Sequence, residues 1–337
     1  MDVVRFLYER KSMEMVRFLY ERMRWRNRLY RALAVIAILA AAAFAVRLVY
    51  ANRRLAAARQ QAADVFYRLK ELELEVARLQ PGAPQRKAYA ERRTRLESVY
   101  ADWLSQLEKS STERRDARAI RAAVARLGEA PMLVSDRFIS DVRSQVAQWR
   151  KTADFTSSVR DAASHGYPGM IQSVLTQNSL PPDLMWLAFQ ESRFRPTAIG
   201  PPTRFGIAKG IWQLMPSTAR AYGLRIGPLV GEPRYDPRDQ RHDPVLATRA
   251  AARYVGDLYM VDAQGSGLLV MAGYNAGQSR VLRLLRSLPA TPRDRNFWKL
   301  VESYRDSIPD ETYGYVVGIV AADAAAAEPD AFGLPGT

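Results

Sequence analysis

Cysteine is absent from the 337-residue chain, which excludes structural disulfides, thiolate metal sites, cysteine nucleophiles and a lipidated N-terminal cysteine. Histidine is scarce as well. The two histidines, His165 and His242, have no second histidine at the spacing that a metal-binding helix uses. We therefore expect neither a metal centre nor any other cofactor.

Strand-like alternation is also missing, because no run of residues alternates apolar and polar side chains with a clear period of two. The chain is predicted to be all-α. Its composition, 48% hydrophobic and 25% charged, is that of a globular protein, and its length allows more than one domain. The net charge of +15 favours polyanionic surroundings such as membrane lipid, cell-wall polymer or nucleic acid. No run interleaves basic and aromatic residues in a known nucleic-acid module, so we expect no nucleic acid partner.

An apolar run near the N-terminus predicts contact with a membrane. The segment 29–51 contains this run and reaches the roughly 20 residues needed to span a bilayer. Basic residues in 1–28 outnumber those just after the run, which predicts a cytoplasmic N-terminus and export of the remainder. We expect 29–51 to be a transmembrane anchor, with a signal segment cleaved near residues 43–45 as the alternative. A near-repeat within 1–28 leaves two readings: Met13 as the true start, or a basic helix on the membrane face.

Helical spacing of apolar residues continues beyond this segment. Residues 52–135 have the pattern of polar, amphipathic helices, interrupted at a Pro-Gly-Ala-Pro break. Two interpretations are open for them: a coiled stalk or hairpin that binds a cell-envelope protein, and simple packing onto the following domain. Residues 136–327 form a further series of helices, predicted to be the main domain, and residues 328–337 are a tail.

One carboxylate lies on an apolar helical stripe. The residues at positions i, i+3, i+4 and i+7 of this stripe are Leu184, Leu187, Ala188 and Glu191. A helix would therefore direct Glu191 to the same face as its apolar neighbours, and Pro196 predicts that the helix stops soon afterwards. Burial and the carbonyl end of the helix both disfavour a negative charge and raise the pKa of Glu191. A carboxylic acid with a raised pKa is suited to general acid catalysis.

Four motifs begin with this acid and continue to the end of the domain. In chain order they are Glu191-Ser192-x-Phe194-x-Pro196-x-Ala198, Gly210-Ile211-Trp212-Gln213-Leu214-Met215-Pro216-x-Thr218-Ala219, Tyr274-Asn275-Ala276-Gly277 and Pro309-Asp310-Glu311-Thr312-x-x-Tyr315-Val316. Together they resemble the lytic transglycosylases, over residues 155–325. The resemblance implies that 136–327 is a lysozyme-like catalytic domain, whereas residues 1–135 show no motif that can be placed.

The resemblance implies an enzyme that cleaves the β-1,4 bond between N-acetylmuramic acid and N-acetylglucosamine in peptidoglycan without water. Glu191 would protonate the glycosidic oxygen and then accept the proton of the C6 hydroxyl of the muramic acid, which closes into a 1,6-anhydro end. One acid suffices, whereas most glycoside hydrolases need two carboxylates. Glu232, Asp236 and Asp239 lie in a Pro/Arg-rich loop and are predicted to be solvated surface rather than a second catalytic carboxylate.

Two alternative functions remain at this point: a muramidase that hydrolyses the same bond, and a catalytically silent cell-wall-binding assembly protein. With an anchor at 29–51, the resemblance implies a single-pass protein of the bacterial inner membrane whose catalytic domain is periplasmic. A cleaved segment would release the protein into the periplasm instead. The expected partners are peptidoglycan glycan strands, the membrane through 29–51, and a cell-envelope protein through 52–135.

The family's motifs also imply a set of substrate-binding residues, namely Ser192, Gln213, Met215, Thr218, Tyr274, Asn275, Glu311 and Tyr315. Tyr274 is expected either to contact the sugar or to hydrogen-bond to the catalytic acid. A purely structural tyrosine there, and a core role for Met215, stay open. The segment 199–209 is longer than in commoner members and lacks their serine. Our hypothesis is that Arg204 and Lys209 within it meet carboxylates of the stem peptide.

Overall fold

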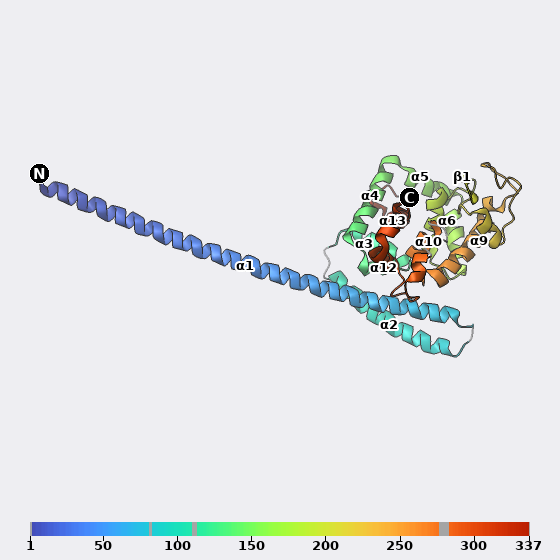
Figure 1. The fold of residues 1–337 in the computed structure, drawn as a ribbon, viewed down its shortest axis with the longest axis horizontal. Helices are drawn as coiled ribbons and strands as arrows, with labels where there is room; N and C mark the ends of the chain where they lie inside the picture. The colour runs from blue at the N-terminus through green and yellow to red at the C-terminus, as the bar shows by residue number, and fades with distance from the viewer. Residues whose placement is uncertain (1, 81–82, 110–112, 276–282, 337) are drawn as a thin grey trace. The chain divides into compact units, whose positions relative to one another are not determined.

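The computed structural model describes residues 2–80, 83–109, 113–275 and 283–336. The chain divides into two compact units, Met1–Ala58 and Arg59–Thr337. Helices dominate the described residues, and a two-stranded hairpin is the exception among them (Figure 1). The prediction of a helical protein is confirmed.

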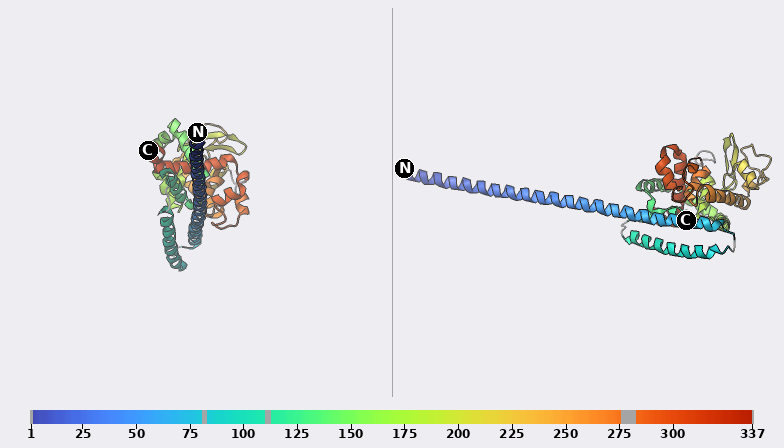
Figure 2. Two further views of the ribbon diagram at one scale, coloured as in Figure 1. Left: turned by 90° about the vertical axis from the view of Figure 1, so that its left-hand side faces the viewer. Right: turned by 60° about the horizontal axis from the view of Figure 1, so that its bottom comes forward.

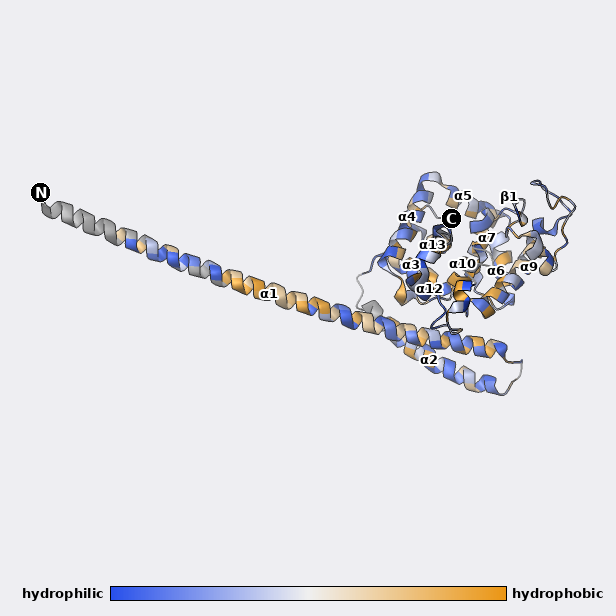
Figure 3. Cartoon of the chain, viewed as in Figure 1, coloured by the Kyte–Doolittle hydropathy of each residue, from blue (hydrophilic) through white to orange (hydrophobic). Residues whose placement is uncertain are grey.

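The first unit consists of helix α1 (Asp2–Arg78), which continues into the second unit. Figure 3 shows an apolar stretch in this helix, bounded on both sides by polar residues. Among the described residues, one helical segment, Leu33–Arg78, is long and apolar enough to cross a bilayer by length and composition. Its most apolar window has a mean hydropathy of 2.4 and no buried residue. The expected anchor at 29–51 overlaps this segment and stays a prediction.

In the second unit, the end of α1 lies beside α2 (Gln85–Lys109), and the two helices form a hairpin (Figure 2). A small apolar cluster holds them together. Its buried members are Ala62, Ala63, Phe66, Tyr67, Ala130 and Met132, and Tyr100, Trp103 and Leu104 of α2 pack against them. These contacts join the end of α1 and α2 into a helical hairpin.

A buried carboxylate joins this hairpin to the rest of the second unit. Glu129 is fully buried. Its side chain accepts hydrogen bonds from Tyr67 Oη at 2.9 Å, from Ser266 Oγ at 2.6 Å and from the Phe297 backbone N–H at 3.0 Å. These donors come from α1, from the start of α10 (Gly267–Asn275) and from the start of α12 (Phe297–Tyr304). The end of α1 thus packs onto the following domain, which is one of the two interpretations that the sequence left open.

Glu129→Gln is expected to destabilise the second unit by about 2–3 kcal/mol. The glutamine amide would place an N–H donor against donors that the Glu129 carboxylate now accepts from, and these buried donors would lose their acceptor. Denaturant unfolding measures this as a lower midpoint at an unchanged slope. The matched control is Glu97→Gln, which removes one arm of an exposed ion pair with Arg93 and should cost under about 0.5 kcal/mol. Equal midpoints for the two variants would show that Glu129 does not join the hairpin to the domain.

The main core of the second unit surrounds α13 (Asp310–Ala327), which is buried along most of its length. It packs against α3 (Arg115–Arg126), α4 (Asp136–Thr152), α7 (Trp186–Ser192) and α10. Further helices among the described residues include α5 (Asp154–Ser164), α6 (Tyr167–Gln177), α8 (Pro216–Ala221) and α9 (Pro244–Asp257). The short 3-10 and π turns are η1 (Pro131–Leu133), η2 (Pro182–Met185), η3 (Gln240–His242), η4 (Leu258–Asp262), η5 (Arg305–Ser307) and η6 (Pro329–Phe332).

The long segment after the acid folds as a β-hairpin, which the sequence did not predict. Strand β1 (Ile199–Thr203) pairs antiparallel with β2 (Gly206–Lys209). Gly206 enters β2 with a φ of +108°, a conformation that side-chain-bearing residues rarely adopt. Two prolines in β1 disrupt the alternation by which strands are read from sequence, and they are tolerated because a two-stranded sheet has free edges.

Candidate active site

The suspected acid lies where the sequence predicts it. The turn η2 leads directly into α7, and Glu191 occupies the last turn of α7, next to the terminal Ser192. Leu184, Leu187 and Ala188 are fully buried, which confirms the apolar stripe. Glu191 itself is partly buried, so its carboxyl group lies at the edge of the core, where a charge is poorly solvated.

The helix ends earlier than Pro196 predicts, because the backbone becomes left-handed immediately after Ser192. Arg193 has a φ of +56° and Phe194 a φ of +60°, a region that residues other than glycine seldom occupy. Packing compensates for this cost: Phe194 is 2% exposed, and the Arg193 guanidinium lies 4.3 Å over the Phe189 ring. Strained backbone of this kind is concentrated at functional sites.

A tyrosine from α13 faces the acid. Tyr315 Oη donates a hydrogen bond of 2.6 Å to Glu191 Oε1. Burial raises the pKa of Glu191 to about 7, and the hydrogen bond from Tyr315, which favours the ionised form, opposes that rise. The predicted elevation of this pKa is borne out, with desolvation as its main cause. Near neutral pH the acid is present in both its protonated and its ionised form.

Two further tyrosines surround the same carboxyl group. The rings of Tyr254 on α9 and Tyr274 on α10 have centroids 5.4 Å apart. Burial raises the pKa of Tyr254 to about 12, and the charges of Asp262 and Glu191 add to the effect. Burial and the Glu191 charge likewise raise the pKa of Tyr274 and of Tyr315 well above the usual value. All three phenols therefore stay protonated at neutral pH and can donate hydrogen bonds.

Tyr254, in α9, is not among the residues that the four motifs implied. The available signal was a tyrosine on a face otherwise formed by small residues, because a buried phenol needs a partner for its hydroxyl group. Tyr274 Oη donates to the Trp212 backbone carbonyl at 2.7 Å. In this structure Tyr315, and not Tyr274, holds the hydrogen bond to the acid.

The motif after Tyr274 is tied to the last helix. Asn275 Oδ1 accepts a hydrogen bond of 2.8 Å from Thr312 Oγ1 on α13. The rest of that motif, residues 276–277, lies outside the described residues. Glu311, next to Thr312, is exposed in the first turn of α13. The structure thus brings Tyr315 to the acid and leaves Glu311 at the surface.

Ser192 joins α7 to the second motif. Its side chain is buried, and Ser192 Oγ donates to the Ile211 carbonyl at 2.7 Å and accepts from the Arg195 backbone N–H at 3.1 Å. These partners belong to the protein backbone. The hydroxyl group therefore fixes the end of α7 against the segment that contains Gln213.

Gln213 has a φ of +46°, a third left-handed position among residues other than glycine near the acid. Its Nε2 donates to the carbonyls of Gly210 at 2.8 Å and Ala198 at 3.2 Å, so the side chain lies back across its own turn. Met215, which precedes α8, and Thr218 within α8 are both partly buried. Gln213, Met215 and Thr218 thus belong to the segment that Ser192 holds against α7.

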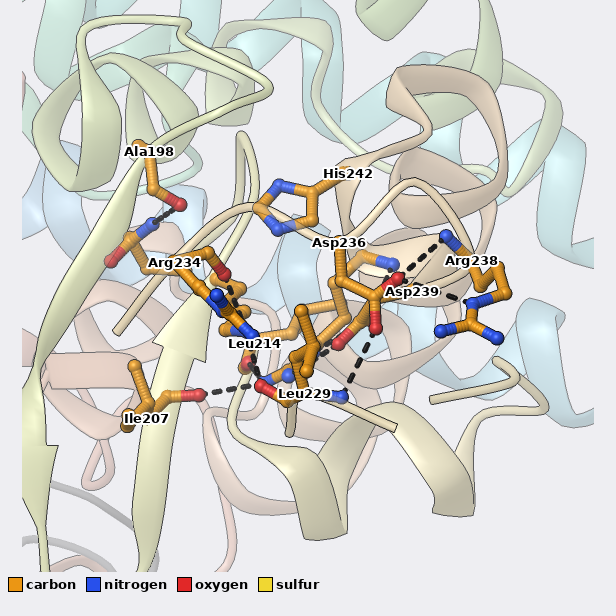
Figure 4. A network of polar contacts seen from close by, with 12 residues as sticks. Ala198, Ile207, Leu214, Leu229, Arg234, Asp236, Arg238, Asp239 and His242 are labelled. Carbon is orange, nitrogen blue, oxygen red and sulfur yellow. Dashed lines mark hydrogen bonds and ion pairs between the residues drawn. The ribbon is translucent and has the colours of Figure 1, made fainter. Parts of the chain in front are cut away.

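Two of the three loop carboxylates predicted to be solvated are in fact buried, which corrects that prediction. Asp239 and Arg241 form a fully buried ion pair at 2.7 Å. Burial alone would raise the pKa of Asp239, but its bonds to Arg241 hold it below the usual range. Asp236 is 1% exposed and accepts from the Leu229 N–H at 3.1 Å (Figure 4). Only Glu232 is exposed. The basic neighbours of these carboxylates suggested a solvated loop, but one of them, Arg241, is buried and forms the ion pair with Asp239.

The hypothesis for Lys209 is wrong. Lys209 is fully buried, and its Nζ donates to the Leu229 carbonyl at 2.8 Å and the Arg234 carbonyl at 2.9 Å. It supports the loop from inside and cannot reach a stem peptide. The guanidinium of Arg204 lies 4.6 Å over the exposed Phe205 ring on the hairpin, and its proposed contact stays a prediction.

The two histidines have structural surroundings. His242 Nδ1 lies 2.8 Å from the Pro196 carbonyl oxygen, and the exposed His165 stacks on Tyr167 with ring centroids 5.4 Å apart. In the part of the chain that the structure describes, no group of three or more His, Cys, Asp or Glu side chains is placed to hold a metal ion.

The segment that contains these features matches a known family. Residues 170–297 match the family model described as the transglycosylase SLT domain. This chain carries an SLT domain. The matched range includes Glu191, Gln213 and Tyr274, whereas Tyr315 lies beyond its end. The family predicted from the four motifs is confirmed.

The chain is also similar to named proteins. Membrane-bound lytic murein transglycosylase D of Escherichia coli strain K12 is 30% identical over 180 residues, which are 53% of this chain and 35% of that protein. The protein of the same name from Escherichia coli O6:H1 strain CFT073 matches to the same extent. The match thus spans 35% of the length of these curated relatives. Among solved structures, the 70 kDa soluble lytic transglycosylase of Escherichia coli is 21% identical with a TM-score of 0.34, over 59% of this chain and 32% of that one.

Proposed function

We propose that this chain is a lytic transglycosylase that cleaves the β-1,4 bond between N-acetylmuramic acid and N-acetylglucosamine of peptidoglycan without water. The observation that carries the proposal is the partly buried Glu191 at the end of α7, with a raised pKa and a hydrogen bond to Tyr315, within an SLT domain. The curated relatives are lytic murein transglycosylases by name, which supports the same substrate.

In the proposed reaction Glu191 starts protonated. Its proton passes to the glycosidic oxygen as the bond from that oxygen to C1 of the muramic acid breaks. The C6 hydroxyl oxygen then bonds to C1, and its proton passes to the Glu191 carboxylate, which restores the acid and leaves a 1,6-anhydro ring. A pKa of about 7 suits both steps, because one group is then an effective acid and an effective base near neutral pH.

A single-carboxylate mechanism fits the surroundings of the acid. A hydrolase of the common type needs a second carboxyl group at a set distance across the scissile bond. The loop carboxylates Asp236 and Asp239 are buried and bonded within the loop. Among the described residues, the pKa shift of Glu191 arises from burial and from Tyr315, and a neighbouring carboxylate is not one of its causes. These contacts favour transfer to an internal hydroxyl group over hydrolysis.

The remaining motif residues receive supporting roles in this proposal. Gln213, Met215 and Thr218 line the glycan groove beside Tyr274, whose hydroxyl group donates to the Trp212 carbonyl. Asn275, bonded to Thr312 of α13, holds the turn that presents Tyr274 to the sugar. Ser192 acts by holding α7 against the groove segment, because its hydroxyl group is engaged by backbone groups. The exposed Glu311 meets the glycan from the first turn of α13.

The proposal includes a place in the cell envelope. We assign 29–51 as a single transmembrane anchor, with the N-terminus in the cytoplasm and the SLT domain in the periplasm. The apolar window within Leu33–Arg78 and the basic residues before it support this assignment. A protease added to intact spheroplasts should digest the SLT domain and spare an epitope fused to the N-terminus. The opposite protection pattern would contradict the assignment.

Mass spectrometry of digested peptidoglycan tests the proposed reaction. Purified full-length protein should release fragments with 1,6-anhydromuramic ends, one water lighter than the fragments that a hydrolase releases. Reducing muramic ends would instead identify a muramidase. Glycan binding without any released fragment would identify a silent wall-binding protein.

Tyr315→Phe should lower kcat about tenfold, because it removes a positioned donor beside the reacting acid. The Tyr315 hydrogen bond lowers the pKa of Glu191, so its loss should raise that pKa further. The activity lost on the alkaline side, where Glu191 is deprotonated, should then be lost at a higher pH than in the wild type. The pH dependence of kcat measures the position of this alkaline limb. An alkaline limb that moves to lower pH in Tyr315→Phe would contradict the assigned contact.

A further inference from the structure

Besides Glu191, a second buried carboxyl group lies near α7, and its hydrogen-bonding capacity is only partly used. Asp323, in the C-terminal half of α13, is 3% exposed. Its Oδ1 accepts a hydrogen bond of 3.0 Å from Arg126 Nη2, and Arg126 Nε lies 3.7 Å from Asp183 Oδ1. One guanidinium, at the end of α3, therefore bridges two carboxylates from different elements.

Those elements are the ones that carry the reacting pair. Asp183 lies in η2, which runs directly into α7 and Glu191, while Asp323 shares α13 with Tyr315. Between the two contacts the helices approach closely, since a Cβ on Gly318 would lie 2.9 Å from Gln190 Oε1. The α7–α13 pair is thus joined at one place by Tyr315 and Glu191 and at another by the bridge formed by Arg126.

The bonding around Asp323 is incomplete. Asp323 Oδ2 and Trp186 Nε1, which belongs to the first residue of α7, are both buried without a hydrogen-bond partner. The Trp186 indole is nevertheless near enough to Asp323 to lower its pKa. A small approach of α7 to α13 would therefore form a Trp186–Asp323 hydrogen bond, and this bond is stronger when the carboxyl group is ionised.

Asp323 also titrates in the neutral range. Burial raises the pKa of Asp323 to about 7; Arg126 opposes the rise, the charge of Asp183 adds to it, and the Trp186 contact lowers it. These groups face Asp323 from α3, η2 and α7. α4 and α10 also pack against α13, but burial and the groups from α3, η2 and α7 are the main causes of the shift.

We propose that Asp323, held by Arg126, is a positioning residue that sets the placement of the catalytic helix α7 against α13 and makes that placement depend on the charge of Asp323. The proposal rests on the proposed function, because the reacting pair it positions is Glu191 and Tyr315. Ionised Asp323 holds Arg126 and can attract Trp186. Protonated Asp323 loses the ion pair, so α7 is held less firmly below neutral pH. Activity should therefore fall on the acid side through Asp323 and on the alkaline side through Glu191.

The test compares Asp323→Asn, which is permanently neutral and of equal size, with the wild type in kcat against pH on peptidoglycan. The variant should have about a tenth of the maximal kcat and a flat profile between about pH 5 and pH 7, where the wild type declines, while the alkaline limb stays in place. The matched control is Asp116→Asn, which breaks the pair of Asp116 with Arg143 at 2.7 Å between α3 and α4. The control should lose stability but keep the shape of the wild-type profile. An acid limb retained in Asp323→Asn would overturn the proposal.

A second readout is independent of turnover. The indole NMR signal of Trp186 in the uniformly labelled full-length protein, assigned with Trp186→Phe, should move with pH around a midpoint near about 7 in the wild type and stay fixed in Asp323→Asn. A fixed signal in the wild type would overturn the inference even if anhydro fragments are released. Release of no anhydro fragments, with a titrating Trp186 signal, would overturn the proposed function and leave the positioning contact intact.

Discussion

Glu191→Gln is expected to lower kcat on peptidoglycan by about a thousandfold or more, because the proposed reaction uses this one group first as acid and then as base. An amide of the same size keeps the packing of α7 but can neither donate the proton nor accept the one from the C6 hydroxyl group. The effect should exceed that of Tyr315→Phe, which leaves the acid in place. A fragment assay by liquid chromatography measures both variants. Residual activity within tenfold of the wild type would contradict the role of Glu191.

The same substitution should make the protein more stable at alkaline pH. Burial raises the pKa of Glu191 to about 7 in the folded state from a usual value of 4.5. The folded protein therefore binds the proton more tightly than the unfolded chain, and the associated stability is fully present below 4.5 and is lost as pH rises through about 7. Glutamine carries no charge, so above this range the variant should be more stable by about 3 kcal/mol. Unfolding at several pH values measures the difference, which should vanish in acid.

Gly210→Ala is the substitution expected to damage the fold most. A Cβ at this position would lie 1.7 Å from the Arg241 carbonyl oxygen, and the φ of Gly210 is +84°. The Arg241 backbone cannot move away cheaply, because its guanidinium is fixed by Asp239 and by the Leu214 carbonyl at 3.1 Å. We expect a loss of at least about 4 kcal/mol of stability, or about 10 °C in melting temperature. Activity should fall with it, since Gly210 begins the segment that contains Gln213.

Gly231→Ala is the matched control for this experiment. Gly231 lies in the Pro/Arg-rich loop after α8, and an added Cβ there meets nothing within 4 Å. Its melting curve should lie within about 2 °C of the wild type. If Gly210→Ala also melted within that range, the buried network around Arg241 would be looser than its contacts indicate.

The sequence was sufficient to predict the acid and its helix. Glu191 was identifiable because it continues the stripe of Leu184 and Leu187, and a charged residue on a core face is rare. The raised pKa followed from the same pattern. The four motifs then predicted the family and pointed to Tyr315, although the Glu191–Tyr315 contact depends on how α7 packs against α13, which a local pattern does not encode.

The buried charges of the loop after α8 could not be predicted in the same way. Arg241 and Asp239 are ordinary surface residues by type. Their burial is stabilised by their mutual ion pair and by the backbone carbonyls that accept hydrogen bonds from Arg241. Lys209 is buried because two backbone carbonyls, at Leu229 and Arg234, turn inward to accept from it. The hydrogen-bond acceptors of Lys209 lie twenty or more positions away in the chain, so no local spacing rule predicts these bonds.

The extent of the compact unit was also beyond the sequence pattern. Apolar spacing in 52–135 fitted a free stalk as well as a packed hairpin. The hydrogen bonds of Glu129 with Tyr67 and Ser266 decide between these two structures, because they hold the hairpin against the domain. The compact unit accordingly begins at Arg59. A truncated protein that starts at residue 136 should therefore fold poorly, since it lacks Glu129 and the helix that covers it.

Digestion of peptidoglycan in water enriched in oxygen-18 tests the central claim most directly. If the C6 hydroxyl group replaces water, the released muramic ends should be 1,6-anhydro rings that carry no heavy oxygen, and Glu191→Gln should release none of them. One heavy oxygen at C1 for each bond cut by the wild-type protein would show that water attacks, and would contradict internal transfer by a single acid.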